Sequence, residues 1–188
     1  MPALRPGQRQ HGLTLIELLL FVVVVGIALS AMLKVFVTAT TASADPMIRR
    51  QQLAIAESLL REVELMPFTW CEPSSAGADT ATSAAACTVQ EAMGPEAGES
   101  RYGPVNFFDN VNDYSGFTMS GIGDVTGATV PGLSGYTASV SISAAALDSV
   151  PGGEALKITV TVTPPGNRPN DAISLQGWRT RYAPTATN

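Results

Sequence analysis

A long apolar segment near the N-terminus constrains this chain more than any other feature. The sequence has no charged residue between Leu18 and Leu33, and the residues from Leu13 to Ile16 extend the apolar run to ~20 residues, enough for a helix to cross a bilayer. Residues 13–35 are therefore predicted to form a transmembrane helix. The anchor residues selected from this segment are Leu18, Phe21, Val25, Leu29 and Leu33.

Basic residues precede this segment and predict its orientation. Arg5, Arg9 and His11 occur without any acidic residue, so the positive-inside bias places residues 1–12 in the cytoplasm and sends the rest of the chain outward. A cleaved signal peptide is one alternative, but its candidate site at residues 42–44 lies well beyond an apolar core longer than the usual ~7 to 15 residues. A plain signal anchor is the other alternative.

Glu17 is the single carboxylate in this apolar environment. An ionised carboxylate in a membrane helix costs a few kcal/mol and commonly marks a functional partner. Gly12, followed by Leu-Thr-Leu-Ile-Glu17 and an apolar helix, resembles the N-terminus of type IV prepilins and type II secretion pseudopilins. The resemblance implies that a membrane-embedded prepilin peptidase cuts between Gly12 and Leu13 and N-methylates the new terminus. Leu13 stands where the family often has phenylalanine.

A cut at this position has a physical consequence for Glu17. The apolar segment stays attached to the mature chain, which gains an α-amino group close to Glu17. In a filament, that ammonium of one subunit can neutralise Glu17 of a neighbour inside a dry helical core, where charges persist mainly as pairs. Glu17 is therefore predicted to dock subunits, and Glu17→Ala is expected to permit insertion and cleavage but to impair incorporation.

Composition limits the possible partners. The chain has 188 residues and a formal charge of −5, which becomes −7 when Arg5 and Arg9 are removed with the leader. An acidic chain without a basic cluster argues against a nucleic-acid partner.

Catalysis is disfavoured by the residues that the mature chain lacks. The single histidine, His11, lies in the leader, so no imidazole remains for a catalytic triad or a zinc site. Pairs of glutamates could serve glycoside hydrolysis, but no spacing predicts that two of them face each other. The glutamates considered are Glu62, Glu64, Glu91, Glu96 and Glu99. We therefore predict neither an enzyme nor a cofactor or small-molecule substrate.

A second helical segment follows the anchor and is predicted over residues 36–67. Ile48, Ile55, Leu59, Val63 and Met66 fall on one face, which indicates an amphipathic helix that Pro67 ends. The Asp45-Pro46 pair leaves two alternatives open. Either Asp45 caps a restarted helix, or Pro46 kinks one long helix.

Residues 68–135 are rich in loop-forming residues and contain both cysteines. Cys71 and Cys87 bracket a Ser, Ala, Thr and Gly stretch, and an extracytoplasmic location favours a disulfide between them, worth ~3 kcal/mol in the chain-entropy model. Two free thiols are the alternative. Metal binding by two cysteines alone is disfavoured because a structural zinc site needs four ligands.

Aromatic residues concentrate between Tyr102 and Met119, and we interpret this segment as a loop held to the core by its rings, in preference to a ligand platform. Asp109, Asn112 and Asp113 are weak candidates for calcium ligands, since they cluster hard oxygen atoms. Asp124 is a possible additional ligand. No metal is assigned on this basis.

The last third of the chain shows strand patterns. Residues 136–142 and 156–162 alternate apolar and polar side chains, with a hairpin loop at 148–154, and a third strand is predicted at 172–182 with Gly177 as a bulge. Arg179 and Arg181 are expected to point outward as solvated charges. The predicted fold class is α+β, in which a long N-terminal helix packs on a small antiparallel sheet of about three strands, as in pilins.

Three inner segments resemble one branch of the family, the MshD-type minor pilins of the mannose-sensitive haemagglutinin (MSHA) pilus system. The three segments are Ser43-Ala-Asp-Pro-Met-Ile-Arg-Arg, Phe108-Asp-Asn-Val-Asn-Asp-Tyr and Gly177-Trp-Arg-Thr-Arg-Tyr-Ala-Pro. The resemblance implies a minor pilin, held in the inner membrane with a periplasmic head over residues 68–188, that enters a pilus near its tip to initiate or regulate assembly. Its implied partners are the prepilin peptidase, other pilins and the inner-membrane assembly platform. A minor pseudopilin of a type II secretion system and a tip adhesin are the alternatives.

Overall fold

The computed structural model describes residues 12, 14–103, 105–182 and 185, and the side chains of residues 39–45 are not described. The chain divides into two compact units, an N-terminal unit (Met1–Pro46) and a head unit (Met47–Asn188), and each is described by itself. Helix α1 (Leu15–Leu65) contributes to both units. The helix passes Pro46 without a break, whereas the side chain of Asp45, the cap of a restarted helix, lies outside the described residues.

The N-terminal unit consists of the apolar part of α1. Residues Leu15–Thr38 form a 24-residue stretch with a mean hydropathy of 2.7, and none of it is buried within the structure. This stretch is long and apolar enough to cross a membrane. Such an exposed apolar surface would be unfavourable in water, because hydrophobic burial contributes ~25 cal/mol per Å² of apolar surface removed from it.

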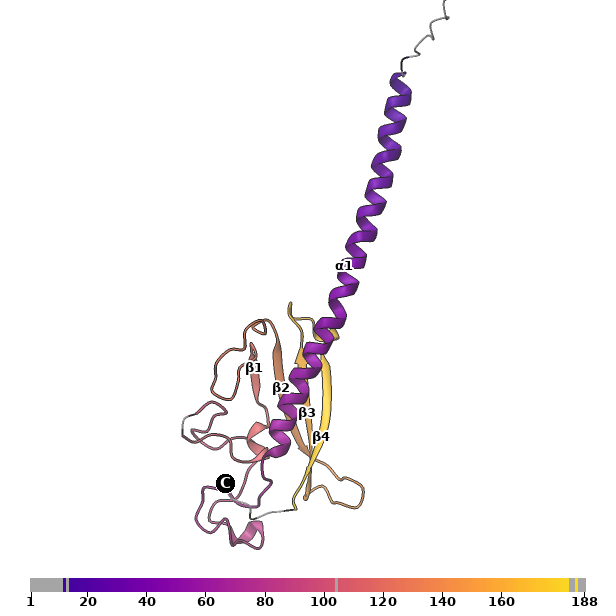
Figure 1. Cartoon of the computed structure of the whole chain (residues 1–188). Helices are drawn as coiled ribbons and strands as arrows, with labels where there is room; N and C mark the ends of the chain where they lie inside the picture. Colours follow the sequence, from indigo (N-terminus) through magenta and orange to yellow (C-terminus); the bar gives the residue numbers. More distant parts are fainter. Residues whose placement is uncertain (1–11, 13, 104, 183–184, 186–188) are drawn as a thin grey trace, which may run out of the picture. The chain divides into compact units, whose positions relative to one another are not determined.

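The head unit contains a single described sheet of four antiparallel strands in the order β1-β2-β3-β4 (Figure 1). The strands are β1 (Thr118–Ser120), β2 (Thr137–Ala144), β3 (Ala155–Thr163) and β4 (Ile173–Thr180). The α+β class is confirmed, and the sheet has four strands where about three were expected. Strand β1 has only three residues, too few to show the alternation by which a strand is recognised in a sequence.

The prediction of a bulge at Gly177 is wrong. Strand β4 pairs with β3 in an unbroken register, in which Gly177 lies opposite Ile158. A Cβ atom at this position would collide with the carboxylate of Glu64 and would lie 3.0 Å from Cδ1 of Leu60, both on α1. Glycine therefore permits a close approach of the helix to the sheet, which is the alternative reason for a glycine within a strand.

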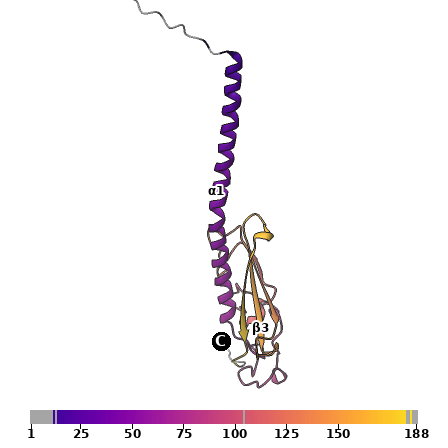
Figure 2. The same cartoon turned by 90° about the vertical axis from the view of Figure 1, so that its right-hand side faces the viewer.

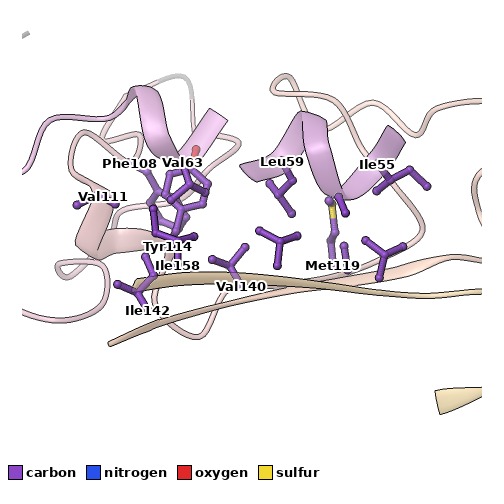
Figure 3. Packing of buried hydrophobic residues seen from close by; sticks show 14 of the residues in the cluster. Ile55, Leu59, Val63, Phe108, Val111, Tyr114, Met119, Val140, Ile142 and Ile158 are labelled. Carbon is purple, nitrogen blue, oxygen red and sulfur yellow. The ribbon is translucent and has the colours of Figure 1, made fainter. Parts of the chain in front are cut away.

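One face of the sheet is covered by the last turns of α1 (Figure 2). Ile55, Leu59 and Val63 are 8%, 3% and 0% exposed and point toward the strands that carry Val140 and Ile158 (Figure 3). The apolar face predicted for this part of the helix therefore forms the centre of the core.

A polar side chain adds further links between α1 and the rest of the head unit. The side-chain amide of Gln52 donates hydrogen bonds to the carbonyl oxygens of Val162 (2.9 Å) and Asp171 (3.0 Å). Gln52 is only 1% exposed, so these bonds satisfy an amide that would otherwise be buried without partners.

The expectation for Arg181 is not met. Its side chain is only 14% exposed, and its guanidinium carbon lies 3.9 Å from the ring centre of Phe68. Its nearest ion-pair partner is Glu154, with 3.8 Å between Nε and the carboxylate. Arg179 is half-buried and stacks on Tyr182. Apolar packing of the guanidinium face, invisible to an alternation pattern, explains the difference.

Part of the aromatic segment packs as expected for a loop held by its rings, whereas Phe107 is 55% exposed. Phe108 and Tyr114 are buried, and their ring centres lie 4.9 Å apart in an edge-to-face arrangement that also includes Phe117. Tyr114 belongs to a short 3₁₀ helix, η2 (Val111–Tyr114). Two further 3₁₀ helices, η1 (Ala84–Ala86) and η3 (Pro169–Asp171), lie in the loops.

Candidate functional site

The first candidate site is the segment around the predicted cleavage position. Gly12 and Thr14 are exposed, and Leu13, the residue predicted to follow the cut, lies outside the described residues. The Thr14 carbonyl accepts hydrogen bonds from the backbone N–H groups of Glu17 (3.1 Å) and Leu18 (3.2 Å), which begins α1. Gly12 therefore lies just before the helix, and its own backbone is not helical.

Glu17 lies in the first turn of α1 and is exposed. A negative charge at this end of a helix interacts favourably with the unpaired N–H groups of the first turn, by roughly 0.3–1 kcal/mol at an exposed site. In the described part of the chain, Glu17 makes no ion pair. Its charge is therefore available to a partner from outside the chain.

The apolar residues after Glu17 are exposed on all sides of the helix. Leu18 and Phe21 are 57% and 64% exposed, Leu29 and Leu33 are 56% and 66% exposed, and Val25 is half-buried. A helix that is apolar all round is suited to a membrane or to the core of an assembly.

The comparison with protein families agrees with this geometry. The family model for the prokaryotic N-terminal methylation motif matches residues 7–33. The match spans Gly12, Glu17 and most of the apolar stretch, and it supports the class of type IV prepilins and pseudopilins, whose members are structural proteins. Comparisons with curated proteins and with solved structures found no match.

In the head unit, a disulfide joins Cys71 and Cys87, whose Cα atoms lie 5.3 Å apart. Cys71 is buried and forms a small apolar cluster with Ala78 and Ala81 inside the loop that the bond closes. The disulfide thus holds together a segment whose small residues offer little core of their own. It also fixes the position of Glu72, which follows Cys71 directly.

The residues considered as calcium ligands are placed differently from one another. Asp109 and Asp113 each lie in a group of three carboxylates, whereas Asn112 is buried with an unpartnered Oδ1 atom. Asp124 falls in none of these groups among the described residues. Its carboxylate accepts hydrogen bonds from Thr126 and Ala128, which lower its pKa and close a local turn.

The second candidate site is an acidic cluster in the loops of the head unit. We define the acidic cluster as Glu72, Glu91, Glu96, Glu99, Asp109 and Asp113. The cluster contains three overlapping groups of three carboxylates, and within each group one oxygen atom from every residue lies within 4.8 Å of the others. The groups are Glu72, Glu91 and Glu96; Glu72, Glu99 and Asp109; and Glu96, Glu99 and Asp113.

Burial and mutual repulsion raise the pKa of four members of this cluster. Burial, followed by the charge of Asp113, raises the pKa of Glu91 to about 9. Burial and the charge of Glu72 raise the pKa of Glu96 to about 7 and that of Asp109 to about 6. Burial also raises the pKa of Asp113 to about 7, against backbone hydrogen bonds that favour its ionised form.

Another carboxylate of the head unit, Glu62, shows the opposite arrangement because it has its own counter-charge. Arg101 donates to both carboxylate oxygens, at 2.6 and 2.8 Å, and also to the carbonyl oxygens of Gly123 and Asp124. The Tyr114 hydroxyl donates to Glu62 at 2.8 Å, and burial together with this bond raises the pKa of Tyr114. Glu62 of α1 is thus tied to two loops of the head.

Sequence reasoning treated Glu91, Glu96 and Glu99 only as possible catalytic carboxylates, and it missed Glu72 and the cluster as a whole. The cluster joins positions that are far apart in irregular loops, so no periodicity could reveal it. A local signal did exist in the charge balance. Residues 72–113 contain seven acidic residues and one basic residue, Arg101.

Proposed function

We propose that this protein is a minor pilin that the prepilin peptidase processes between Gly12 and Leu13 and that then enters a type IV pilus of the MSHA kind. The observation that carries the proposal is the methylation motif at residues 7–33, set directly before an exposed apolar helix with Glu17 in its first turn. The head is proposed to lie in the periplasm while the helix rests in the inner membrane.

The exposed apolar part of α1 supports an assembly role. Residues 15–35 are exposed apart from the half-buried Val25, so their apolar side chains can contact lipid first and then helices of other subunits. Both the lipid and a filament core keep the apolar surface away from water. Helix packing and polar pairing therefore decide whether the helix moves from the lipid into the filament.

Glu17 supplies the polar pairing in this proposal. Within a bundle of apolar helices, its carboxylate is costly unless a cation lies beside it. The N-terminal ammonium that peptidase cleavage creates on a neighbouring subunit is a cation at the matching depth. Cleavage and docking are thereby linked, since an uncut chain lacks this ammonium at Leu13.

Two further questions are which assembly system the protein belongs to and whether its head binds a ligand outside the cell. The three inner segments that resemble MshD-type minor pilins favour the MSHA system, whereas a minor pseudopilin of a type II secretion system would have the same anchor and the same Glu17. A tip adhesin is less favoured, because the rings of Phe108 and Tyr114 are buried in the head, and a single exposed ring such as that of Phe107 does not form a platform.

In vivo cross-linking tests the proposal. A photo-reactive residue placed at Val25 in the full chain is expected to link to other mature pilins in cells that contain the peptidase. In cells without the peptidase, these products are expected to disappear. Glu17→Ala is expected to remove them while insertion and cleavage continue.

The matched control is Ser30→Ala, which also removes a polar group from the apolar stretch. The Ser30 hydroxyl donates to the Gly26 carbonyl of its own helix at 2.7 Å, so it needs no partner. Cross-links that persist with Glu17→Ala, or that vanish equally with Ser30→Ala, would contradict the docking role. The identity of the linked partners distinguishes a pilus from a secretion system.

A further inference from the structure

We propose that the head unit binds a calcium ion in a cavity lined by four carboxylates of the acidic cluster. The cavity has a volume of about 380 Å³, and its acidic lining residues are Glu72, Glu96, Glu99 and Asp109. Asn106 and Ser74 add neutral oxygen atoms to the wall. This inference is independent of the role in filament assembly.

The spacing of the carboxylates fits a cation of this size. Calcium lies ~2.3–2.6 Å from each oxygen ligand, so two ligands of one ion are separated by at most about twice that distance. Oxygen atoms of Glu72, Glu99 and Asp109 all lie within 4.8 Å of one another. A second group, formed by Glu96, Glu99 and Asp113, meets the same limit and shares Glu99 with the first.

Unpartnered oxygen atoms on nearly fully buried side chains provide a second, independent observation. Glu72 is 5% exposed and lines the cavity; its Oε1 accepts hydrogen bonds from Ser74, whereas its Oε2 has no donor among the described residues. Asp113 is 0% exposed, and its Oδ2 accepts from the backbone of Asp109 and Asn110, which leaves Oδ1 unpartnered there. Buried oxygen atoms normally have a partner, and a cation supplies one for several of them at once.

The charges of the described chain do not neutralise the acidic cluster. None of the ion pairs in the described part of the chain involves a member of the cluster. Arg101, the basic residue of this segment, is held by Glu62 in a buried two-bond pair. Arg181 acts on Glu91 only through space, and its ion-pair partner is Glu154.

The donor set selects calcium over other common metals. All candidate ligands are oxygen atoms, because the cysteines are joined in a disulfide and zinc prefers sulfur and nitrogen. Magnesium demands a near-octahedral shell and keeps several waters, whereas calcium accepts six to eight oxygen ligands in irregular geometry. Carboxylates from separate loops are suited to the second kind of shell.

A bound ion would join parts of the head that secondary structure does not connect. Glu72 follows the disulfide, Glu96 and Glu99 lie in the next loop, and Asp109 precedes η2. These loops gather beyond the last turn of α1 at the end of the head unit (Figure 1). We therefore expect the ion to hold these loops together, as the disulfide holds the loop between Cys71 and Cys87.

Calorimetric titration of the full chain in detergent micelles with Ca²⁺ tests the site, with Mg²⁺ as the comparison. We expect stoichiometric binding of Ca²⁺, weaker binding of Mg²⁺, and a rise in the melting temperature by about 5 °C or more when Ca²⁺ is 100-fold above its dissociation constant. No binding heat and no melting shift at millimolar Ca²⁺ would overturn the proposal.

The pair Glu99→Gln/Asp109→Asn removes two charges from the site without changing side-chain size. It is expected to weaken Ca²⁺ binding at least tenfold. In a calcium chelator it is expected to melt at or above the wild-type temperature, because two repelling charges are gone. A variant that merely misfolds would melt lower in the chelator, and wild-type binding then still decides the question.

Asp79→Asn is the matched control, because Asp79 is an acid inside the disulfide loop that lies in none of the carboxylate groups. We expect its affinity for Ca²⁺ to equal that of the wild type. Equal losses in Asp79→Asn and in Glu99→Gln/Asp109→Asn would show a diffuse attraction of cations to an acidic surface, and would overturn the site.

Discussion

The N-terminal unit and the head unit both hold negative charge that the described chain does not neutralise, but they do so in opposite surroundings. Glu17 is a lone carboxylate in the first turn of an exposed apolar helix. The acidic cluster crowds six carboxylates into partly buried loops. No other charged residue lies between Glu17 and Lys34 in the first region, whereas the second region brings several acidic residues together.

The difference indicates what kind of partner each region needs. A lone carboxylate on an apolar helix is matched by a single positive charge presented on an equally apolar surface, such as the N-terminus of another subunit. Several carboxylates within 4.8 Å of one another are matched by a compact divalent ion. Charge alone would not have separated the two cases, because the surroundings decide.

Glu62 shows how the head unit neutralises a buried carboxylate within the chain. Its carboxylate is also largely buried, with 18% of the side chain exposed, but Arg101 satisfies both oxygens within the chain. The head can therefore neutralise an acid when its fold requires it to do so. Glu17 and the acidic cluster differ from Glu62, because no cation of the described chain pairs with them. We therefore expect each of them to have a partner from outside the chain.

The largest expected effect is that variants in the two regions change different properties of the protein. Glu17→Gln should lower incorporation into filaments about tenfold or more, the cost of losing one buried pair, and leave Ca²⁺ affinity unchanged. Glu99→Gln/Asp109→Asn should lower Ca²⁺ affinity and leave peptidase processing unchanged. Filament recovery and calorimetry of the same proteins measure both effects. If Glu17→Gln also weakened Ca²⁺ binding, the two regions could not be treated separately.

Arg101→Met should lower the free energy of unfolding by about 3 kcal/mol, because it leaves the carboxylate of Glu62 buried without its cation. Urea unfolding of the full chain in micelles measures the change. Arg61→Met is the control, since its pair with Glu57 is exposed and is worth at most about 0.5 kcal/mol. Similar costs for both variants would refute the contrast between buried and exposed pairs.

The disulfide should contribute ~3 kcal/mol, which Cys71→Ser/Cys87→Ser would remove. It closes a segment with a sequence separation of 16 residues. Because Glu72 directly follows Cys71, the variant should also bind Ca²⁺ more weakly. A reducing agent should shift the unfolding midpoint of the wild type and have no effect on the variant. An unchanged Ca²⁺ affinity would mean that Glu72 is positioned without the disulfide.

A change of packing without charge should have the smallest effect. Gly177→Ala places a methyl group against Glu64 and Leu60; the flexible Glu64 carboxylate can move aside, so we expect a loss of about 1 kcal/mol. Gly153→Ala is the control, because no atom lies within 4 Å of the position that its methyl group would take, and its φ is not positive. If both variants unfolded at the same urea concentration, Gly177 would not be explained by the close approach of α1.

Regular patterns made most of the fold predictable from the sequence. The apolar stretch, the face with Ile55, Leu59 and Val63, and the alternation of β2 and β3 each follow one period over many residues. Strand β1 was missed because three residues do not establish a period. Arg181 was misplaced because alternation assigns a side, whereas the ring of Phe68 provides a surface on which a guanidinium can pack.

The two candidate sites also differ in how far they could be predicted from the sequence. Gly12 and Glu17 lie close together in the sequence, so the motif could be recognised directly, and the match to residues 7–33 agrees with it. The acidic cluster depends on how loops containing Glu72, Glu99 and Asp109 fold onto one another. Asp109 and Asp113 were singled out by local spacing, but their partners come from residues earlier in the chain.

Intact-mass analysis of the protein from membranes of cells with and without the prepilin peptidase tests the central claim most directly. We predict a peptidase-dependent product that begins at N-methylated Leu13. A chain that remains uncut in both strains, or one that begins near Asp45 after a signal-peptide cut, would contradict this claim.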